Sequence, residues 1–202
     1  MANKKNITRR IKSAVISVSD KSNLKPLLQT LNRYNVKLIS SGGTFKAIRK
    51  LGYRCLEVSE YTGFNEILDG RVKTLHPKIH AGILNKRNSK SHSEEIKLND
   101  FQNIDLVVVN FYPFEKTLNT TKNHNEIIEK IDIGGPALVR SAAKNYNDVA
   151  VITSITQYSE LIAQLKRFKG ATKLEFRKKL SQSAFCLLYT SDAADDTSGG
   201  DR

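Results

Sequence analysis

Asp105-Leu106-Val107-Val108-Val109 is the stretch that decides the fold of this chain. Its short, continuous apolar run is typical of a parallel strand that is buried on both faces. The polar stretch Asn110-Phe111-Tyr112-Pro113-Phe114 follows directly. In an open parallel sheet, ligands bind outside the carboxyl ends of the strands. The stretch therefore predicts a buried strand with candidate binding groups at its carboxyl end.

Strand and helix patterns alternate on both sides of this stretch. Residues 13–18 form an apolar run of strand type, and a helix with leucines at helical spacing follows. The alternation continues with strands predicted at 36–39, 53–58 and 148–153, and helices at 45–51, 125–131, from Pro136, 156–168 and 172–187. This order predicts an α/β fold with a mainly parallel, five-stranded sheet flanked by helices.

The two ends of the chain differ from its body. Residues 1–11 carry four basic side chains and no acid, and we interpret them as a flexible lead-in. Residues 12–186 are predicted to form one domain. From Thr190 onward the chain changes abruptly to small and acidic side chains, and we expect residues 187–202 to be a disordered or non-native tail.

Composition favours an anionic partner. The 202 residues include 33 Lys and Arg against 20 Asp and Glu, for a net charge of +13. Such a balance suits a nucleotide, a phosphorylated metabolite or a nucleic acid. The two cysteines have no metal-type spacing, and there is neither a membrane-spanning apolar run nor a secretory signal. We expect a reduced, cytoplasmic protein.

Two polar loops each follow a predicted strand and precede a predicted helix. They are Ser17-Val18-Ser19-Asp20-Lys21 and Ser41-Gly42-Gly43-Thr44. Hydroxyls, backbone N–H groups and a helix N-terminus together can cradle a phosphate, although the same residues also suit ordinary helix capping. Their recurrence after consecutive strands favours phosphate binding. Neither loop has a dinucleotide-binding or Walker A pattern.

A basic stretch, Gly70-Arg71-Val72-Lys73-Thr74-Leu75-His76-Pro77, runs on to His80 and Gly82. Proline and the bracketing glycines make a long helix unfavourable, so we expect a loop. Such a loop can hold cations around an anion, or it can be a solvated surface. The two histidines lie four residues apart, but Pro77 between them argues against a zinc site.

The segment from Ile131 to Asn145 is a further candidate. A helix that starts at Pro136 places Arg140 and Lys144 on one face, where they are either functional groups or a pair of surface cations.

The chain resembles a known family through five motifs that occur in one order. They are Ser-Val-Ser-Asp-Lys, Ser-Gly-Gly-Thr, Gly-Arg-Val-Lys-Thr-Leu-His-Pro, Asn-Phe-Tyr-Pro-Phe and Ile-Asp-Ile-Gly-Gly-Pro-Ala-Leu-Val-Arg-Ser-Ala-Ala-Lys-Asn. Together they are similar to the N-terminal inosine-monophosphate cyclohydrolase domain of the bifunctional purine-biosynthesis family, over about residues 12–186. The resemblance implies a methylglyoxal-synthase-like, doubly wound sheet and a homodimer. It also implies that the native chain continues into a formyltransferase domain.

The resemblance implies the cyclodehydration of 5-formamidoimidazole-4-carboxamide ribotide (FAICAR) to inosine monophosphate (IMP), without a metal or another cofactor. Tyr112 and Lys144 would donate hydrogen bonds to the developing oxyanion, and Asp132 with Lys73 would orient the carboxamide and assist its deprotonation. The substrate-binding positions implied are Ser17, Ser19, Lys21, Ser41, Gly42, Gly43, Thr44, Arg71, Thr74, Asn110, Gly134 and Gly135.

Three other functions remain open from the sequence. The same fold serves methylglyoxal synthase, which acts on a small triose phosphate, and a regulatory nucleotide-binding module in carbamoyl-phosphate synthetase. The length of the match argues against the first. A basic nucleic-acid binder is the third, but the chain lacks interleaved aromatic residues and a recognisable binding motif. We therefore expect neither a membrane nor a nucleic acid as partner.

Overall fold

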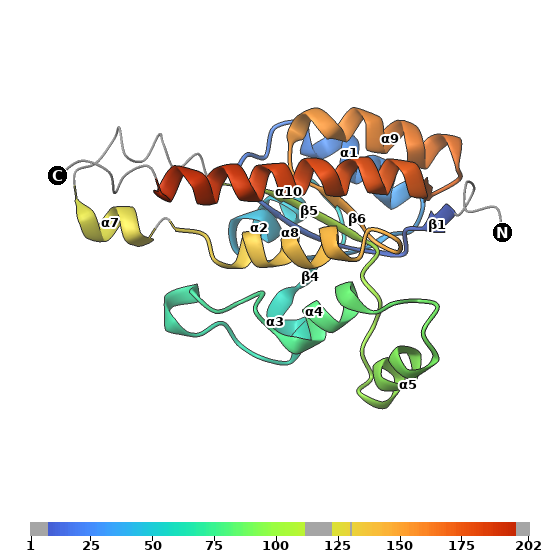
Figure 1. Ribbon diagram of the computed structural model, residues 1–202, viewed down its shortest axis with the longest axis horizontal. Helices are drawn as coiled ribbons and strands as arrows, with labels where there is room; N and C mark the ends of the chain where they lie inside the picture. Colours follow the sequence, from blue (N-terminus) through green and yellow to red (C-terminus); the bar gives the residue numbers. More distant parts are fainter. Residues whose placement is uncertain (1–7, 112–122, 130, 197–202) are drawn as a thin grey trace.

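A five-stranded parallel sheet forms the centre of the computed structural model, which describes residues 8–111, 123–129 and 131–196 (Figure 1). The strand order across the sheet is β4-β3-β2-β5-β6, and every neighbouring pair is parallel. The strands are β2 (Ser13–Val18), β3 (Lys37–Ser40), β4 (Leu56–Glu57), β5 (Leu106–Asn110) and β6 (Ala150–Ile152). This arrangement confirms the predicted α/β fold, and β5, beside the central strand β2, is the predicted buried strand.

The order of the strands creates a switch point between β2 and β5. From β2 the chain moves outward through β3 to β4, and it then crosses to β5 and β6 on the other side. The loops that follow β2 and β5 therefore lead away in opposite directions, which opens a crevice for ligands at the carboxyl edge. Val18 pairs with Asn110 at this edge.

Helices cover the sheet along its length. They are α1 (Leu24–Arg33), α2 (Gly42–Lys50), α3 (Val58–Thr62), α4 (Pro77–Leu84), α5 (Lys90–Leu98), α7 (His124–Glu129), α8 (Gly134–Lys144), α9 (Tyr158–Arg167) and α10 (Leu174–Asp196), with short 3-10 turns η2 (Leu68–Gly70) and η3 (Ile155–Gln157). The leucines of α1 are buried, as their spacing predicts. Figure 1 shows α9 beside α1, and α10 alongside α8, which also contacts β5, β6 and α4. Among the described helices, none is long and apolar enough to cross a membrane.

The prediction for the start of the chain is wrong for residues 8–11. Thr8–Arg10 forms strand β1, which pairs antiparallel with β7 (Ala171–Lys173), and Ile11 is completely buried. The partner strand lies about 160 residues further along the chain, so local composition gives no sign of it. Residues 1–7 lie outside the described part.

Of the two alternatives for the tail, disorder is wrong for residues 187–196, while a non-native origin stays a prediction. Helix α10 continues through Asp196, and Leu188 is only 2% exposed. Phe176, Leu180, Ala184 and Leu188 are all buried and recur every fourth residue, so one apolar stripe runs past the predicted boundary. Residues 197–202 lie outside the described part.

The basic stretch from Gly70 is only partly the loop that its composition predicts. Its second half forms α4, in which Pro77 occupies the first turn and the His76 ring accepts a hydrogen bond from the Lys78 backbone N–H at 3.1 Å. Gly82 is buried within α4, and a β-carbon there would lie 2.5 Å from the carbonyl oxygen of Gln102. Glycine therefore lets α4 approach the segment that leads into β5.

Candidate functional site

Asn110 connects the two loops of the switch point. Its side-chain oxygen accepts hydrogen bonds from the backbone N–H groups of Ser19 at 2.7 Å and Asp20 at 2.9 Å. Its amide nitrogen donates to the Asp20 carbonyl oxygen at 2.8 Å. Asn110, at the end of β5, thereby holds the polar loop that follows β2, so the two ends of the neighbouring strands form one rigid edge.

Thr44 fixes the second polar loop to the same edge. Its side chain is buried, and its hydroxyl accepts a hydrogen bond from the Val18 backbone N–H and donates one to the Val18 carbonyl oxygen. In this state the Thr44 hydroxyl is engaged by the end of β2. It therefore holds the start of α2 against β2.

The start of α2 combines free backbone donors with two ammonium groups. Its N-cap residue, Ser41, makes no side-chain capping bond, and the first turn contains no acid. The first N–H groups of a helix have no partner within the helix. Lys73 Nζ would lie 3.7 Å from a β-carbon at Gly42, and Lys21 Nζ 3.9 Å from one at Gly43. Donors, helix dipole and positive charge converge here, as a phosphate site requires.

Lys21 is held at this position by its own loop. Its ammonium donates to the carbonyl oxygens of Ser19 at 3.1 Å and Val18 at 3.4 Å. Ser17 lies half-buried within β2, and Ser19 is also half-buried. The loops after β2 and β3 thus meet, through the contact of Thr44 with Val18 and the approach of Lys21 to Gly43.

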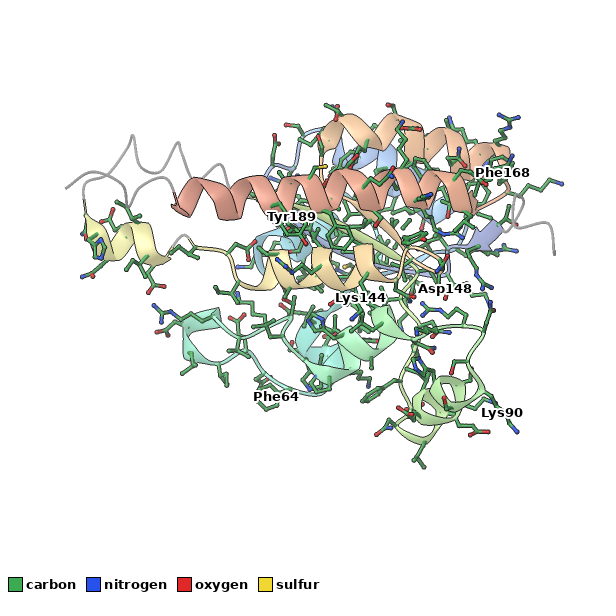
Figure 2. The ribbon with its side chains drawn as sticks, in the orientation of Figure 1. Phe64, Lys90, Lys144, Asp148, Phe168 and Tyr189 are labelled. Carbon is green, nitrogen blue, oxygen red and sulfur yellow. The ribbon has the colours of Figure 1, made fainter. Side chains whose placement is uncertain are left out.

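A cavity of about 230 Å³ adjoins the start of α2 on the side of β4 and α3. Its lining residues are Ser41, Glu57, Val58, Ser59, Phe64, Asn65, Glu66 and Lys73. Phe64 lies beside α3 on the face of the molecule away from α10 (Figure 2). Lys73 forms an ion pair with Glu66, with 2.8 Å between Nζ and the carboxylate oxygen. The cavity therefore carries both acceptors and a cation next to the first turn of α2.

Asp132, Thr74 and the two glycines of α8 meet where this helix starts. The Asp132 carboxylate accepts a hydrogen bond from the Gly135 backbone N–H at 2.8 Å. A β-carbon at Gly134 would lie 2.7 Å from the Thr74 hydroxyl, and one at Gly135 would clash with the Asp132 carboxylate. These glycines therefore permit the close approach of a carboxylate and a hydroxyl to the helix N-terminus.

Arg71 is directed towards α7 rather than towards α2. It is exposed and forms a hydrogen-bonded ion pair with Glu129, whose carboxylate pKa is lowered chiefly by the hydrogen bond from Arg71. The pair joins the loop that carries Lys73 to α7. Arg71 thus lies at the outer margin of the site.

Lys144 lies apart from the other candidates. It is exposed at the carboxyl end of α8, with Asp148 beyond it (Figure 2). The rise along a helix puts its backbone about 15 Å from Gly134. The neighbouring Asn145 binds the carbonyl oxygens of Ile83 and Asn85, at the end of α4. Tyr112 lies outside the described residues.

His76 and His80 belong to the scaffold of the described region. His76 caps α4, and His80 Nδ1 lies 2.9 Å from the Ser141 hydroxyl of α8. Burial lowers the pKa of His80. Within the described ranges, no group of three or more His, Cys, Asp or Glu side chains is placed to hold a metal ion.

Sequence reasoning missed the residues of the cavity other than Ser41 and Lys73. Glu66 is the clearest of these, because it contacts a candidate catalytic side chain directly. The sequence feature that could have pointed to Glu66 is the Asp69-Gly70 pair between Ile67 and Val72. Asp-Gly between apolar residues is a strong hairpin signal. A hairpin there places Glu66 opposite Lys73.

Comparisons with known proteins agree with this arrangement. Residues 23–137 match the model of the MGS-like domain family, and residues 142–196 match that of the AICARFT/IMPCHase bienzyme. The chain belongs to the MGS-like domain family. Its fold is also similar to the structure titled "Crystal structure of ForH", with a TM-score of 0.83, 30% identity, and coverage of 95% of this chain and 100% of that one.

Curated relatives extend the similarity along nearly the whole chain. The bifunctional purine biosynthesis protein PurH of Bradyrhizobium diazoefficiens is 46% identical over 186 residues, or 92% of this chain. That of Clostridioides difficile is 49% identical over 182 residues, or 90% of this chain. The chain spans only about 35% of the length of these two relatives.

Proposed function

We propose that this chain acts in purine biosynthesis as an IMP cyclohydrolase, which closes the ring of FAICAR to give IMP and water. The observation that carries the proposal is the convergence of Lys21, Lys73 and the uncapped start of α2 at the switch point. The similarity to PurH proteins supports the choice of substrate. A ribotide offers the phosphate that such a site can bind.

In this proposal the phosphate binds over the first turn of α2. The backbone N–H groups at residues 42–44 donate to its oxygens, and Lys21 contributes a charge-assisted hydrogen bond. Asn110 and Thr44 fix the positions of the two loops relative to each other, so that little reorganisation is needed when the ligand binds.

The chemical step requires a proton relay and oxyanion stabilisation. The carboxamide nitrogen forms a bond to the formyl carbon and loses one proton. The formamido nitrogen loses its proton as the carbon–nitrogen double bond forms, and the formyl oxygen leaves with these two protons as water. Asp132 and Lys73 orient the carboxamide and assist its deprotonation, from positions beside α8 and α2. Donors to the formyl oxygen are assigned to Tyr112 and Lys144 on the resemblance alone.

The proposal also covers a second domain, the oligomeric state and the cellular compartment. The length of the relatives supports a native protein that continues into a second catalytic domain. We further propose that it works as a homodimer in the reducing cytoplasm. Neither Cys55 nor Cys186 forms a disulfide bond, which accords with such a compartment.

Ultraviolet absorbance of the product tests the proposal. Purified protein is mixed with FAICAR and the formation of IMP is followed, with the uncatalysed reaction as reference. We expect turnover by the wild-type chain, and a loss of about 10²-fold or more for Lys73→Ala, which removes a group from the proton relay. A wild-type rate equal to the uncatalysed rate would contradict the proposed activity.

A further inference from the structure

The pairing of Glu66 with Lys73 is built into the backbone of the segment that carries them. Ile67 and Val72 exchange both backbone hydrogen bonds, at 3.3 and 3.4 Å, and form an isolated antiparallel bridge. The next pair outward in such a ladder is Glu66 and Lys73. It is of the non-hydrogen-bonded kind, in which opposed side chains lie closest together. The hairpin register therefore places the carboxylate opposite the ammonium.

The backbone conformation at the tip of the hairpin also favours the contact between Glu66 and Lys73. Leu68, Asp69 and Gly70 all have positive φ angles, of 54°, 53° and 84°. A β-carbon at Gly70 would clash with Lys73 Cε and would lie 3.7 Å from the Glu66 carboxylate. Only a residue without a side chain leaves Lys73 the room to fold back over the tip towards Glu66.

The contact also fixes where the Lys73 ammonium lies relative to the site. Nζ lies 2.8 Å from the Glu66 carboxylate and would lie 3.7 Å from a β-carbon at Gly42. Glu66 and Lys73 both line the cavity beside α2. Without the carboxylate, a lysine with four rotatable bonds would explore many rotamers away from the helix N-terminus.

From this geometry we infer that Glu66 is a positioning residue, which holds the Lys73 ammonium between the cavity and the first turn of α2. The inference rests on the proposed function, since it concerns how Lys73 is presented to the substrate. Glu66 itself needs no contact with the reacting atoms. Its effect is transmitted through Lys73, and this dependence separates positioning from a general structural role.

Steady-state kinetics on Glu66 variants test the dependence. We expect Glu66→Gln to lower kcat about tenfold with KM within about twofold, as misplacement of one catalytic group predicts. Glu66→Asp, which keeps the charge on a shorter side chain, should recover part of the loss. In a Lys73→Gln background, Glu66→Gln should have no further effect. Equal losses with and without Lys73 would overturn the inference.

Chemical labelling gives a readout that does not depend on turnover. Trace reductive methylation, read by mass spectrometry, should modify Lys73 several-fold faster in Glu66→Gln than in the wild type, because its amine is no longer held by a carboxylate. Glu94→Gln is the matched control, since it removes the carboxylate facing the 92%-exposed Lys90 and lies outside the site. It should leave both Lys73 labelling and turnover unchanged.

The two readouts separate the possible failures. Wild-type protein that makes no IMP would contradict the proposed function, while labelling would still decide whether Glu66 holds Lys73. Normal turnover in Glu66→Gln would overturn the inference and leave the proposed function intact. Unchanged Lys73 labelling would also overturn it, whatever the kinetics. The half-exposed pair adds little to folding stability, so the variants should remain folded.

Discussion

Lys21 and Lys73 come from distant parts of the sequence and meet at the same turn of helix. Lys21 belongs to the loop after β2, and Lys73 lies on the second arm of the hairpin that has η2 at its tip. Each ammonium lies close to one glycine of the start of α2. Their partners differ, because Lys21 binds two carbonyl oxygens and Lys73 binds a carboxylate. This difference supports the proposed division, in which Lys21 binds the phosphate and Lys73 takes part in the chemistry.

Lys21→Ala should weaken binding of IMP more than it changes kcat. Loss of one charge-assisted hydrogen bond to phosphate predicts an affinity lower by roughly 10-fold or more. Isothermal titration calorimetry with IMP measures this directly. Lys25→Ala on the exposed side of α1 is the control and should bind as the wild type does. An unchanged affinity in Lys21→Ala would remove Lys21 from the phosphate site.

Lys144→Ala tests the candidate that the structure leaves apart from the others. If Lys144 donates to the developing oxyanion, its loss should lower kcat by about 10²-fold or more. The absorbance assay on the folded variant measures this, with Lys90→Ala on α5 as the surface control. A near-normal rate would mean that the far end of α8 takes no part in the reaction.

The residues that carry the site were predictable to different degrees. Loops with Ser, Gly and Lys after apolar runs drew attention to the start of α2, for which we propose phosphate binding. The hydrogen bonds by which Asn110 and Thr44 hold the loops could not be predicted in the same way. They join segments that are 91 and 26 residues apart in the chain. Glu66 was overlooked because it lies before the basic stretch, and only the hairpin register brings it opposite Lys73.

At the scale of elements, α10 is anchored by one buried guanidinium. Arg177 is completely buried, and burial lowers its pKa to about 10, so it remains charged at neutral pH. It donates to the carbonyl oxygens of Tyr146, Asn147 and Thr172. The helix is thereby fixed to the segment between α8 and β6 and to strand β7.

Arg177→Met should destabilise the protein by about 3 kcal/mol, because three buried carbonyl groups lose their charged donor. Urea unfolding followed by circular dichroism measures the change. Lys178→Met, at the exposed neighbouring position, controls for the altered charge and should change stability by less than about 0.5 kcal/mol. A similar unfolding midpoint for Arg177→Met and the wild type would show that the anchor contributes little.

Elements with a clear periodic pattern were the predictable ones. The helices α1 and α9 and the strand β5 follow from apolar spacing within a few residues. Strand β1 did not, since its only signal is a partner at residues 171–173. The end of α10 was missed because small acidic residues from 192 onward suggested disorder, although the apolar stripe continues to Leu188.

At the scale of the whole molecule, the sheet order decides where a ligand can bind. Alternating strand and helix patterns predict a parallel sheet, but they do not specify that β5 lies beside β2. That neighbour relation brings Asn110 to the loop after β2 and creates the switch point. Lys144 lies far from Asp132 for a local reason, because the eleven residues of α8 separate the two ends of the same motif.

A crystal structure of the wild-type chain with IMP tests the central claim most directly. The claim is that the carboxyl edge between β2 and β5 binds a nucleoside monophosphate. We predict the phosphate over the first turn of α2, with its oxygens within hydrogen-bond distance of Lys21 Nζ and the N–H groups of residues 42–44. A ligand bound elsewhere, for example in the cavity of about 340 Å³ between α4 and α5, would contradict the claim.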